Sequence, residues 1–249
     1  MNQNVGQSIF PVREVTFEPP ITQTFHANFI AKEAFDFIIS GLILFLLAPF
    51  LAFIALLIRI DSPGPAIFVQ KRIGSRLVKT GNKLTWQRTT FRCFKFRTMI
   101  TNADPSLHKD FMKAFINHEN QEQLATQKDG KPILKLVRDP RITRMGHFLR
   151  KTSLDEFPQF LNVLRGEMSL VGPRPAIPYE LDYYQPWHFQ RLQTKPGITG
   201  LWQVEGRSSV CFDDMVALDI DYIQRRSFWL DLKIILKTPL AVFTCKGAL

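Results

Sequence analysis

Cysteine is scarce in this sequence, with 3 residues in a chain of 249. Cys93, Cys211 and Cys245 are far apart and form no paired motif, which argues against a disulfide framework or a zinc site. The 5 histidines also lack metal-ligand spacing. The chain has no Walker phosphate loop, no Gly-x-Gly-x-x-Gly and no Gly-x-Ser-x-Gly. The scarcity of cysteine favours a reducing compartment. The missing motifs argue against the common nucleotide-binding folds and against serine hydrolases.

Acidic residues are missing from Ser62 to Ala103, although this stretch is rich in lysine and arginine. The whole chain carries a formal net charge of +10. Such a surplus indicates an anionic partner, which composition alone leaves open as nucleic acid, an acidic membrane face or a phosphorylated substrate.

The segment Phe37–Ile58 contains no charged residue and is long enough to cross the hydrocarbon core of a bilayer as a helix. A buried helix of a soluble protein fits poorly, because the segment has no polar face. Pro49 predicts a kink near its middle. The helix either spans the membrane or bends so that both ends return to one side. The cations that follow the segment indicate the cytoplasmic face.

The basic stretch also contains strand patterns. Phe91–Arg97 alternates apolar and basic residues, and Ala66–Gln70 is a second short candidate. On a strand, Lys95 and Arg97 share one face. Two cations on one face suit a phosphate group, although a solvated strand face is the simpler alternative.

The rest of the chain is assigned from periodicity and turn residues. Residues 1–31 predict an N-terminal tail, and Asn102–Lys131 predicts polar helix and loop. A helix is expected from Leu149 to Leu164, starting near Ser153 and ending at Gly166. The remaining predictions are loops at Val171–Pro178 and Lys195–Gly200, a helix at Phe212–Arg225, and an amphipathic element at Phe228–Phe243. That last element could lie in a membrane interface or dock on the core.

The motif Ser153-Leu154-Asp155-Glu156 allows two interpretations. Ser-x-x-Glu is a capping box, and acids at a helix start are stabilised by its dipole. The alternative is catalytic, because Arg150 and Arg174 flank the motif in sequence and keep a carboxylate ionised. An ionised Asp155 can attack phosphorus to form an acyl-phosphate, and Glu156 can hold Mg²⁺ together with substrate phosphates.

Three further positions are candidates for substrate binding. Arg174 lies between Pro173 and Pro175, which hold the backbone rigid, so its guanidinium suits a bidentate phosphate clamp or a structural role in the loop. Arg207 follows a glycine and could serve either purpose. Asp231 stands among apolar neighbours as a helix cap or as the buried partner of an arginine.

Taken together, these motifs resemble the bacterial sugar transferases, the monotopic phosphoglycosyl transferases that act on polyprenyl phosphate. The resemblance covers the chain from about Lys32 to the C-terminus. Its blocks are the hydrophobic segment with Pro49, Phe68–Gly74, Phe94–Met99, Ser153–Glu156, Gly166–Pro175, Lys195–Gly200, Gly206-Arg207 and Asp231–Lys233. Each block is modest alone, but their order makes the match specific.

The resemblance implies an α+β, mainly helical fold. A re-entrant membrane helix at 32–60 precedes a cytoplasmic catalytic domain at 61–249, which has a few short strands and interfacial amphipathic helices. The implied cellular location is the bacterial inner membrane, with the catalytic domain on its cytoplasmic face. Asp155 would attack the β-phosphate of a UDP-sugar, release UMP and pass the sugar phosphate to polyprenyl phosphate, with Glu156 binding Mg²⁺. The substrate-binding residues would be Lys95, Arg97, Arg150, Arg174, Pro175, Arg207 and Asp231.

The sequence departs from the family pattern in two places. Smaller members have Ser-Pro at the membrane kink where this chain has Ala48-Pro49, so the bend must be stabilised differently. The 102–131 insertion lengthens the chain, which leaves donor selection or contact between two copies of a homodimer open. Two alternatives to catalysis are a membrane-anchored basic binding module and a scaffold for polysaccharide assembly. The transferase reading implies inner-membrane lipids, and no nucleic acid, as partners.

Overall fold

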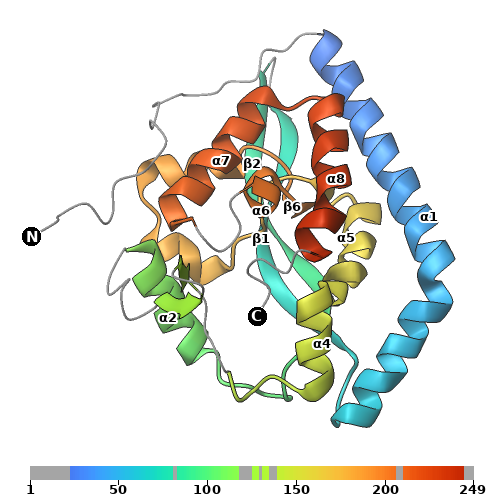
Figure 1. The fold of residues 1–249 in the computed structure, drawn as a ribbon. Helices are drawn as coiled ribbons and strands as arrows, with labels where there is room; N and C mark the ends of the chain where they lie inside the picture. The colour runs from blue at the N-terminus through green and yellow to red at the C-terminus, as the bar shows by residue number, and fades with distance from the viewer. Residues whose placement is uncertain are drawn as a thin grey trace, which may run out of the picture.

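The computed structural model describes residues 23–80, 83–117, 125–128, 131–134, 139–205 and 210–243. A long N-terminal helix lies along one side of a domain built from shorter helices and a long β-hairpin (Figure 1). The described strands form pairs and no larger sheet. The α+β, mainly helical class predicted from the sequence is therefore confirmed, while residues 1–22 of the predicted tail lie outside the described residues.

Helix α1 spans Gln23–Asp61, so it begins before the predicted start at Lys32. It stays helical through Pro49, and Figure 1 shows it bent along its length around the domain. Proline accounts for such a bend because it removes one backbone hydrogen bond and crowds the preceding turn. Within the described chain, Phe29–Asp61 is the one helix whose length and composition suit a membrane crossing.

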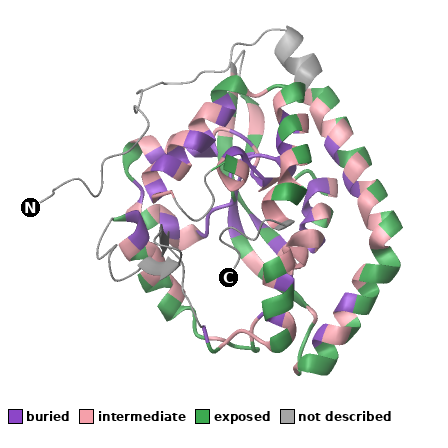
Figure 2. Cartoon of the chain, in the orientation of Figure 1, coloured by how far each residue is buried: buried purple, intermediate pink, exposed green. Residues whose placement is uncertain are grey.

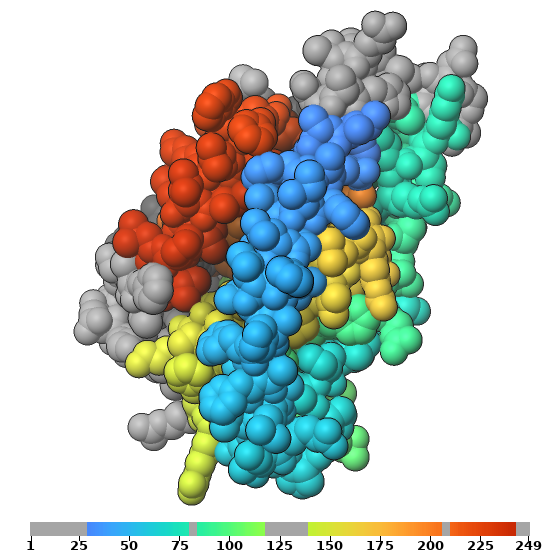
Figure 3. Space-filling view, turned by 90° about the vertical axis from the view of Figure 1, so that its right-hand side faces the viewer, coloured from blue at the N-terminus to red at the C-terminus, as the bar shows by residue number. Residues whose placement is uncertain are grey.

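Only one face of α1 packs on the domain. Its buried residues Asp36, Ser40, Ile54 and Ile58 recur at helical spacing, as expected for a single contact face. The outer face is apolar and uncovered, with Phe45 79% exposed. Figure 2 shows this contrast along the helix, and Figure 3 shows α1 running down one face of the molecule beside α8 (Phe228–Phe243).

Arg97 holds the C-terminal end of α1. Its guanidinium donates to the carbonyl oxygens of Ser62 at 2.6 Å and Ile58 at 3.3 Å, and also to that of Pro63. It further donates to the Thr101 hydroxyl at 2.9 Å. These bonds satisfy carbonyl groups left open where a helix ends. The expectation that Arg97 binds substrate phosphate beside Lys95 is therefore corrected, because its donors face the end of α1.

The hairpin is much longer than the two short strands predicted. Strands β1 (Ile67–Thr80) and β2 (Lys83–Phe96) pair antiparallel along their whole length. The buried amide of Asn162 ties this hairpin to helix α5 (Phe160–Leu164): it accepts from the Phe94 N–H at 3.0 Å and donates to the Arg92 carbonyl at 2.7 Å. This link positions the end of β2 that carries Lys95.

The helix predicted from Leu149 to Leu164 is divided into three. Helix α4 covers Arg144–Thr152, the 3₁₀ helix η1 covers Leu154–Gln159, and α5 follows. The break occurs at Ser153, whose φ of 56° lies in the left-handed region. A continuous helix cannot pass through that conformation. The predicted end at Gly166 is confirmed, since α5 stops just before this glycine with a φ of 70°.

A short parallel pair joins the two regions predicted as loops: β5 (Ser169–Val171) ends where the loop at Val171–Pro178 begins, and β6 (Gly197–Thr199) lies within the loop predicted at Lys195–Gly200. The approach of their flanking backbone requires glycine, because a Cβ on Gly197 would lie 2.1 Å from the Gly172 nitrogen. This contact brings the Gly-Pro-Arg-Pro loop beside the second predicted loop, which the sequence left unconnected.

The predicted insertion is an ordered part of the domain where it is described. Helix α2 (Ser106–Ile116) packs Phe115 and Ile116 into a core cluster with Phe212 and Val216 of α7. Strands β3 (Ala125–Lys128) and β4 (Lys131–Leu134) form a small antiparallel pair. Helix α7 spans Phe212–Arg225, as predicted.

Helix α8 docks on the core, one of the two predicted alternatives, and also exposes an apolar side, while its position in a membrane interface stays a prediction. Asp231 and Ile234 are buried against the domain, whereas Trp229 and Leu236 are 76% and 70% exposed. The short elements η2 (Pro178–Tyr183), η3 (Pro186–Leu192) and α6 (Leu201–Glu205) complete the described fold.

Candidate active site

Three charged side chains from separate segments meet beside η1. Lys95, at the end of β2, donates from Nζ to Glu156 Oε1 at 2.9 Å. The Arg174 guanidinium lies 3.4 Å from the same oxygen. The carboxylate is 20% exposed and Lys95 is 15% exposed, so the cluster is neither fully buried nor freely solvated. The arrangement is open enough for a ligand to reach and shielded enough for charge to act strongly.

A small pocket opens at this cluster. Its lining includes three cationic side chains, one carboxylate and one amide, together with proline, glycine and isoleucine. The lining residues are Arg72, Lys95, Glu156, Gln159, Arg174, Pro175, Gly197 and Ile198. The predicted substrate residues Lys95, Arg174 and Pro175 therefore lie together, and Glu156 lies with them. A pocket lined by three cationic side chains suits a phosphorylated ligand.

Asp155 lies next to this pocket without lining it. Its pKa is raised to about 6: burial raises it most and the charge of Glu156 adds to the rise, while Lys95, Arg150 and Arg174 act in the opposite direction. The sequence predicted that flanking cations keep this carboxylate ionised. The structure adds that burial outweighs them, so Asp155 is a stronger base than an ordinary aspartate while remaining mostly ionised at neutral pH.

Glu156 is perturbed in the opposite direction. Although burial raises its pKa, the charges of Lys95 and Arg174 and the hydrogen bond from Lys95 hold the pKa well below the ordinary range of a glutamate. Two neighbouring carboxylates with pKa values pushed apart are typical of sites in which the two groups have different chemical roles.

The capping-box interpretation of Ser153–Glu156 is wrong. Ser153 adopts a left-handed backbone and its side chain makes no capping hydrogen bond to η1. It instead ends α4, where its N–H bonds to the carbonyls of Arg150 and Leu149. The acids at positions 155 and 156 are thus not explained as partners of a serine cap.

Arg72 is a site residue that the sequence analysis did not single out. It is buried on β1, lines the pocket, and donates from its guanidinium to the Pro175 carbonyl at 2.8 Å. Pro175 follows Arg174, so this bond fixes the loop that presents the Arg174 side chain. The predicted strand ended at Gln70. Had the sequence shown that β1 continues past this residue, Arg72 would have been a candidate, because the longer strand places it beside the Arg174 loop.

Of the other predicted residues, one lies close to Asp155, one lies outside the described residues, and one lies on α1. Arg150 donates from Nε to the Thr98 hydroxyl at 3.0 Å and is close enough to Asp155 for their charges to attract. Arg207 lies outside the described residues. Ala48 is exposed beside Pro49 on the outer side of α1.

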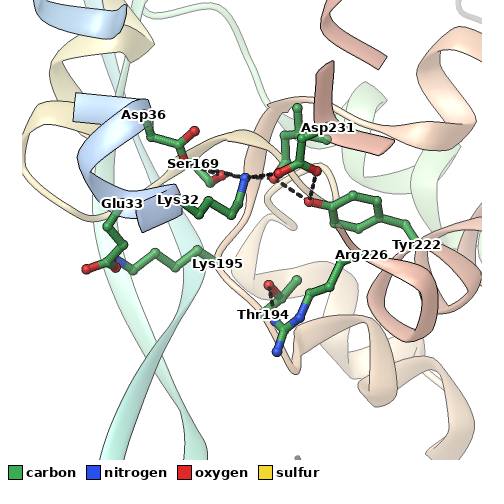
Figure 4. Close-up of polar contacts among 10 residues, drawn as sticks. Lys32, Glu33, Asp36, Ser169, Thr194, Lys195, Tyr222, Arg226 and Asp231 are labelled. Carbon is green, nitrogen blue, oxygen red and sulfur yellow. Dashed lines mark hydrogen bonds and ion pairs between the residues drawn. The ribbon is translucent and has the colours of Figure 1, made fainter. Parts of the chain in front are cut away.

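Asp231 belongs to a different cluster, shown in Figure 4. It accepts from Lys32 at 2.5 Å and from the Tyr222 hydroxyl at 2.8 Å. Ser169 of β5 donates to Asp36 of α1 at 2.6 Å in the same region. These bonds attach α1 to α7, α8 and β5. The prediction that Asp231 contacts substrate is corrected, because its carboxylate is buried in an ion pair with Lys32 of α1.

The described residues contain no group of three or more acidic, histidine or cysteine side chains that could hold a metal alone. Mg²⁺, however, is commonly bound by one or two carboxylates that share it with substrate phosphates and water. The adjacent Asp155 and Glu156, with Glu156 held ionised at the pocket, fit that mode of binding. They do not fit a cage made of protein ligands only.

Known proteins resemble this chain over most of its length. A family described as bacterial sugar transferase matches residues 27–245. The exopolysaccharide production protein ExoY of Sinorhizobium fredii is 38% identical over 219 residues, which cover 88% of each chain. An undecaprenyl-phosphate galactose phosphotransferase of Salmonella typhimurium is 39% identical, covering 87% of this chain and 41% of the relative. A UDP-glucose:undecaprenyl-phosphate glucose-1-phosphate transferase of Caulobacter vibrioides is 37% identical, covering 88% and 72%.

Proposed function

Because the chain belongs to the bacterial sugar transferase family, we propose that it transfers a sugar 1-phosphate from a UDP-sugar to polyprenyl phosphate and releases UMP. Membership of this family makes the chain a phosphoglycosyl transferase, as the sequence predicted, and removes the case for a non-catalytic binding module. One observation supports the site assignment above all: Lys95, Glu156 and Arg174 converge on a cationic pocket beside Asp155.

The proposed reaction has two displacements at one phosphorus. A carboxylate oxygen of Asp155 attacks the β-phosphorus of the UDP-sugar, a P–O bond forms, and the bond to UMP breaks. The phosphate oxygen of the polyprenyl carrier then attacks the same phosphorus. The bond to Asp155 breaks, the polyprenyl diphosphate sugar leaves, and the carboxylate is regenerated.

The cations supply the electrostatic part of this reaction. Lys95 and Arg174 face the pocket and offset negative charge on the transferred phosphoryl group, while Arg150 stabilises Asp155 in its ionised form. Glu156, with Asp155, would hold Mg²⁺, which when bound supplies further neutralisation of the phosphate oxygens. The raised pKa of Asp155 leaves it nucleophilic at neutral pH.

The lipid acceptor requires a membrane, and the exposed apolar face supports membrane association. The outer side of α1 and the adjoining side of α8 expose Phe45, Ile60, Trp229 and Leu236. We infer that α1 is re-entrant: it bends at Pro49 and returns to the cytoplasmic side of the inner membrane. The ion pair of Lys32 with Asp231 and the hydrogen bond of Ser169 to Asp36 hold the N-terminal part of α1 on the domain, and the hydrogen bonds of Arg97 hold its C-terminal end on the same domain, which supports this topology.

The names of the relatives suggest which biosynthetic pathway the chain serves. Their names specify galactose in one case, glucose in another, and exopolysaccharide production in a third. We infer that this chain performs a first membrane step in the synthesis of a bacterial polysaccharide, with a hexose as the transferred sugar.

The test is UMP release from UDP-glucose and UDP-galactose by the detergent-solubilised full chain, with polyprenyl phosphate and Mg²⁺. The Asp155→Asn variant is expected to release no UMP, while Asp182→Asn, at an exposed aspartate, keeps wild-type turnover. A phosphosugar adduct on wild-type protein, absent from Asp155→Asn, is expected by intact mass measurement without the lipid acceptor. Sustained UMP release by Asp155→Asn would overturn the nucleophile assignment.

A further inference from the structure

Helix α2 of the predicted insertion forms a polar contact with η2, the element that follows the Arg174 loop. Helix α2 packs on the core through Phe115 and Ile116 and also contacts η2. On the side facing η2, His108 Nδ1 lies 2.6 Å from the Tyr179 hydroxyl, and the two rings meet edge to face. Tyr179 stands just beyond the loop of Arg174 and Pro175. This hydrogen bond thus joins the insertion to the element that directly follows the Arg174 loop.

The base of α2 is fixed independently of the pair. Asp104 accepts from the Ser106 N–H at 2.9 Å, and Arg141 donates to the Asp104 carbonyl. Arg141 itself forms an ion pair with Asp139 at 2.6 Å. His108 therefore stands on a helix held at its first turn and along its buried face. Rigid placement of this kind is required of a residue that discriminates between substrates.

The charges around His108 indicate which part of a ligand it can meet. Its pKa is lowered to about 4, chiefly by burial and also by repulsion from Arg72, Arg174, Arg141 and Arg150. Two of these arginines line the pocket, and a third, Arg150, also attracts Asp155. The imidazole is therefore neutral at physiological pH. It offers a directional hydrogen bond in a site where the neighbouring cations take the phosphates.

Only one ring nitrogen of His108 is engaged within the described part of the chain. Nδ1 meets Tyr179, whose hydroxyl stays protonated because burial raises its pKa to about 12. Nε2 has no hydrogen-bonding partner among the described residues, and the ring is half-buried. A neutral group on the substrate, close to the phosphorus attacked by Asp155, would complete this nitrogen's hydrogen bonding. In a nucleotide sugar that group is a hydroxyl of the hexose.

We propose that His108, oriented by Tyr179, is a specificity-determining residue that hydrogen-bonds one hydroxyl of the hexose in the donor. This inference rests on the proposed function and names a part of its substrate that the phosphate-binding residues do not recognise. It assigns the insertion a role in donor selection. Proximity to Arg150, and through it to Asp155, favours the sugar over the nucleobase at the other end of the diphosphate.

The experiment compares kcat/KM for the best UDP-hexose of the wild-type chain with that of its monodeoxy analogues at C2, C3, C4 and C6. Wild type is expected to lose about threefold to tenfold on one analogue, the range for a single neutral hydrogen bond. The His108→Phe variant is expected to lose that much on the parent donor and nothing further on that analogue. Tyr179→Phe, which removes only a hydroxyl, should reduce the same discrimination in part.

His147→Phe is the matched control, since His147 is exposed on α4. It should keep the wild-type pattern, and inhibition by UMP should be equal in all variants. The inference is overturned if His108→Phe keeps the full penalty on every analogue, or if UMP inhibition weakens in parallel with donor use. Absence of UMP release from every UDP-sugar by wild type would instead reject the proposed function itself.

Discussion

Lys95 Nζ and Glu156 Oε1 are 2.9 Å apart and join the open end of the long hairpin to the first turn of η1. This bond is the shortest link between the basic stretch and the acidic pair that stood out in the sequence. It lowers the pKa of Glu156, and the charge of Lys95 also opposes the rise in the pKa of Asp155.

Replacing Lys95 by Met should therefore change the pH dependence as well as the rate. Loss of the cation raises the pKa of both carboxylates, so the rising limb of kcat/KM for UMP release should move to higher pH. The rate at neutral pH should fall by about a hundredfold or more, the usual effect of removing a group that stabilises charge in a transition state. Lys95→Arg should restore part of the activity. Lys71→Met, at an exposed lysine of β1, serves as control, and an unshifted limb in Lys95→Met would reject the coupling.

Stability should also depend on pH through Asp155. Its pKa is raised from 3.8 when unfolded to about 6 when folded, so between these values the folded state binds more protons. Its contribution to stability is therefore present below about pH 4 and is lost as the pH rises through 6. Thermal unfolding of wild type should show this loss, and Asp155→Asn should not. An identical pH dependence in the two proteins would contradict the raised pKa.

The Lys32–Asp231 pair should stabilise the attachment of α1 and leave substrate affinity unaffected. Asp231→Asn is expected to lower the free energy of unfolding by about 1–3 kcal/mol, because it leaves a partly buried lysine and tyrosine without their charged partner. KM for the UDP-sugar should stay within about twofold of wild type. A changed KM with unchanged thermal stability would return Asp231 to the substrate site.

The exposed apolar side of α8 should contribute to membrane binding. Trp229→Ser and Leu236→Ser together remove two large side chains that are 76% and 70% exposed. The double variant should be extracted from membranes at lower detergent concentration, while UMP release in detergent is retained. The same substitution at Ile234, which is buried, should instead lower thermal stability. Unchanged extraction would place α8 outside the lipid interface.

The sequence predicted elements well where hydrophobic periodicity was strong. The bounds of α7 and α8 agree with the structure because both helices carry a clear buried face. The apolar segment of α1 was equally plain. The family motifs also brought Lys95, Arg174 and Glu156 into one site, although no local rule places them together. Periodicity reports only which face is buried, so it could not give this convergence.

The failures have identifiable physical causes. The middle of the hairpin mixes arginine, lysine and threonine with apolar residues, so its strands lacked a clean alternation. Ser153 adopts a left-handed backbone that its residue type does not favour, and the predicted helix was therefore not divided. Arg97 and Asp231 were assigned to substrate because charge alone does not distinguish a phosphate from a helix end or a buried lysine. His108 had no motif and gained significance only through its neighbours.

The hydrogen bonds from Arg97 to the carbonyls at the end of α1 affect the geometry of the proposed reaction. Lys95 and Arg97 are two residues apart on an extended segment, a spacing of about 6–7 Å. One faces the candidate pocket and the other faces the last turn of α1. The pocket is thus held at a fixed distance from that end of α1, and it would lie at a fixed height above the lipid if α1 enters the bilayer as proposed. A polyprenyl phosphate, whose headgroup is confined to the lipid surface, would meet the phosphosugar at that height. The spacing between Lys95 and Arg97 would then set the distance between the lipid surface and the reacting phosphorus.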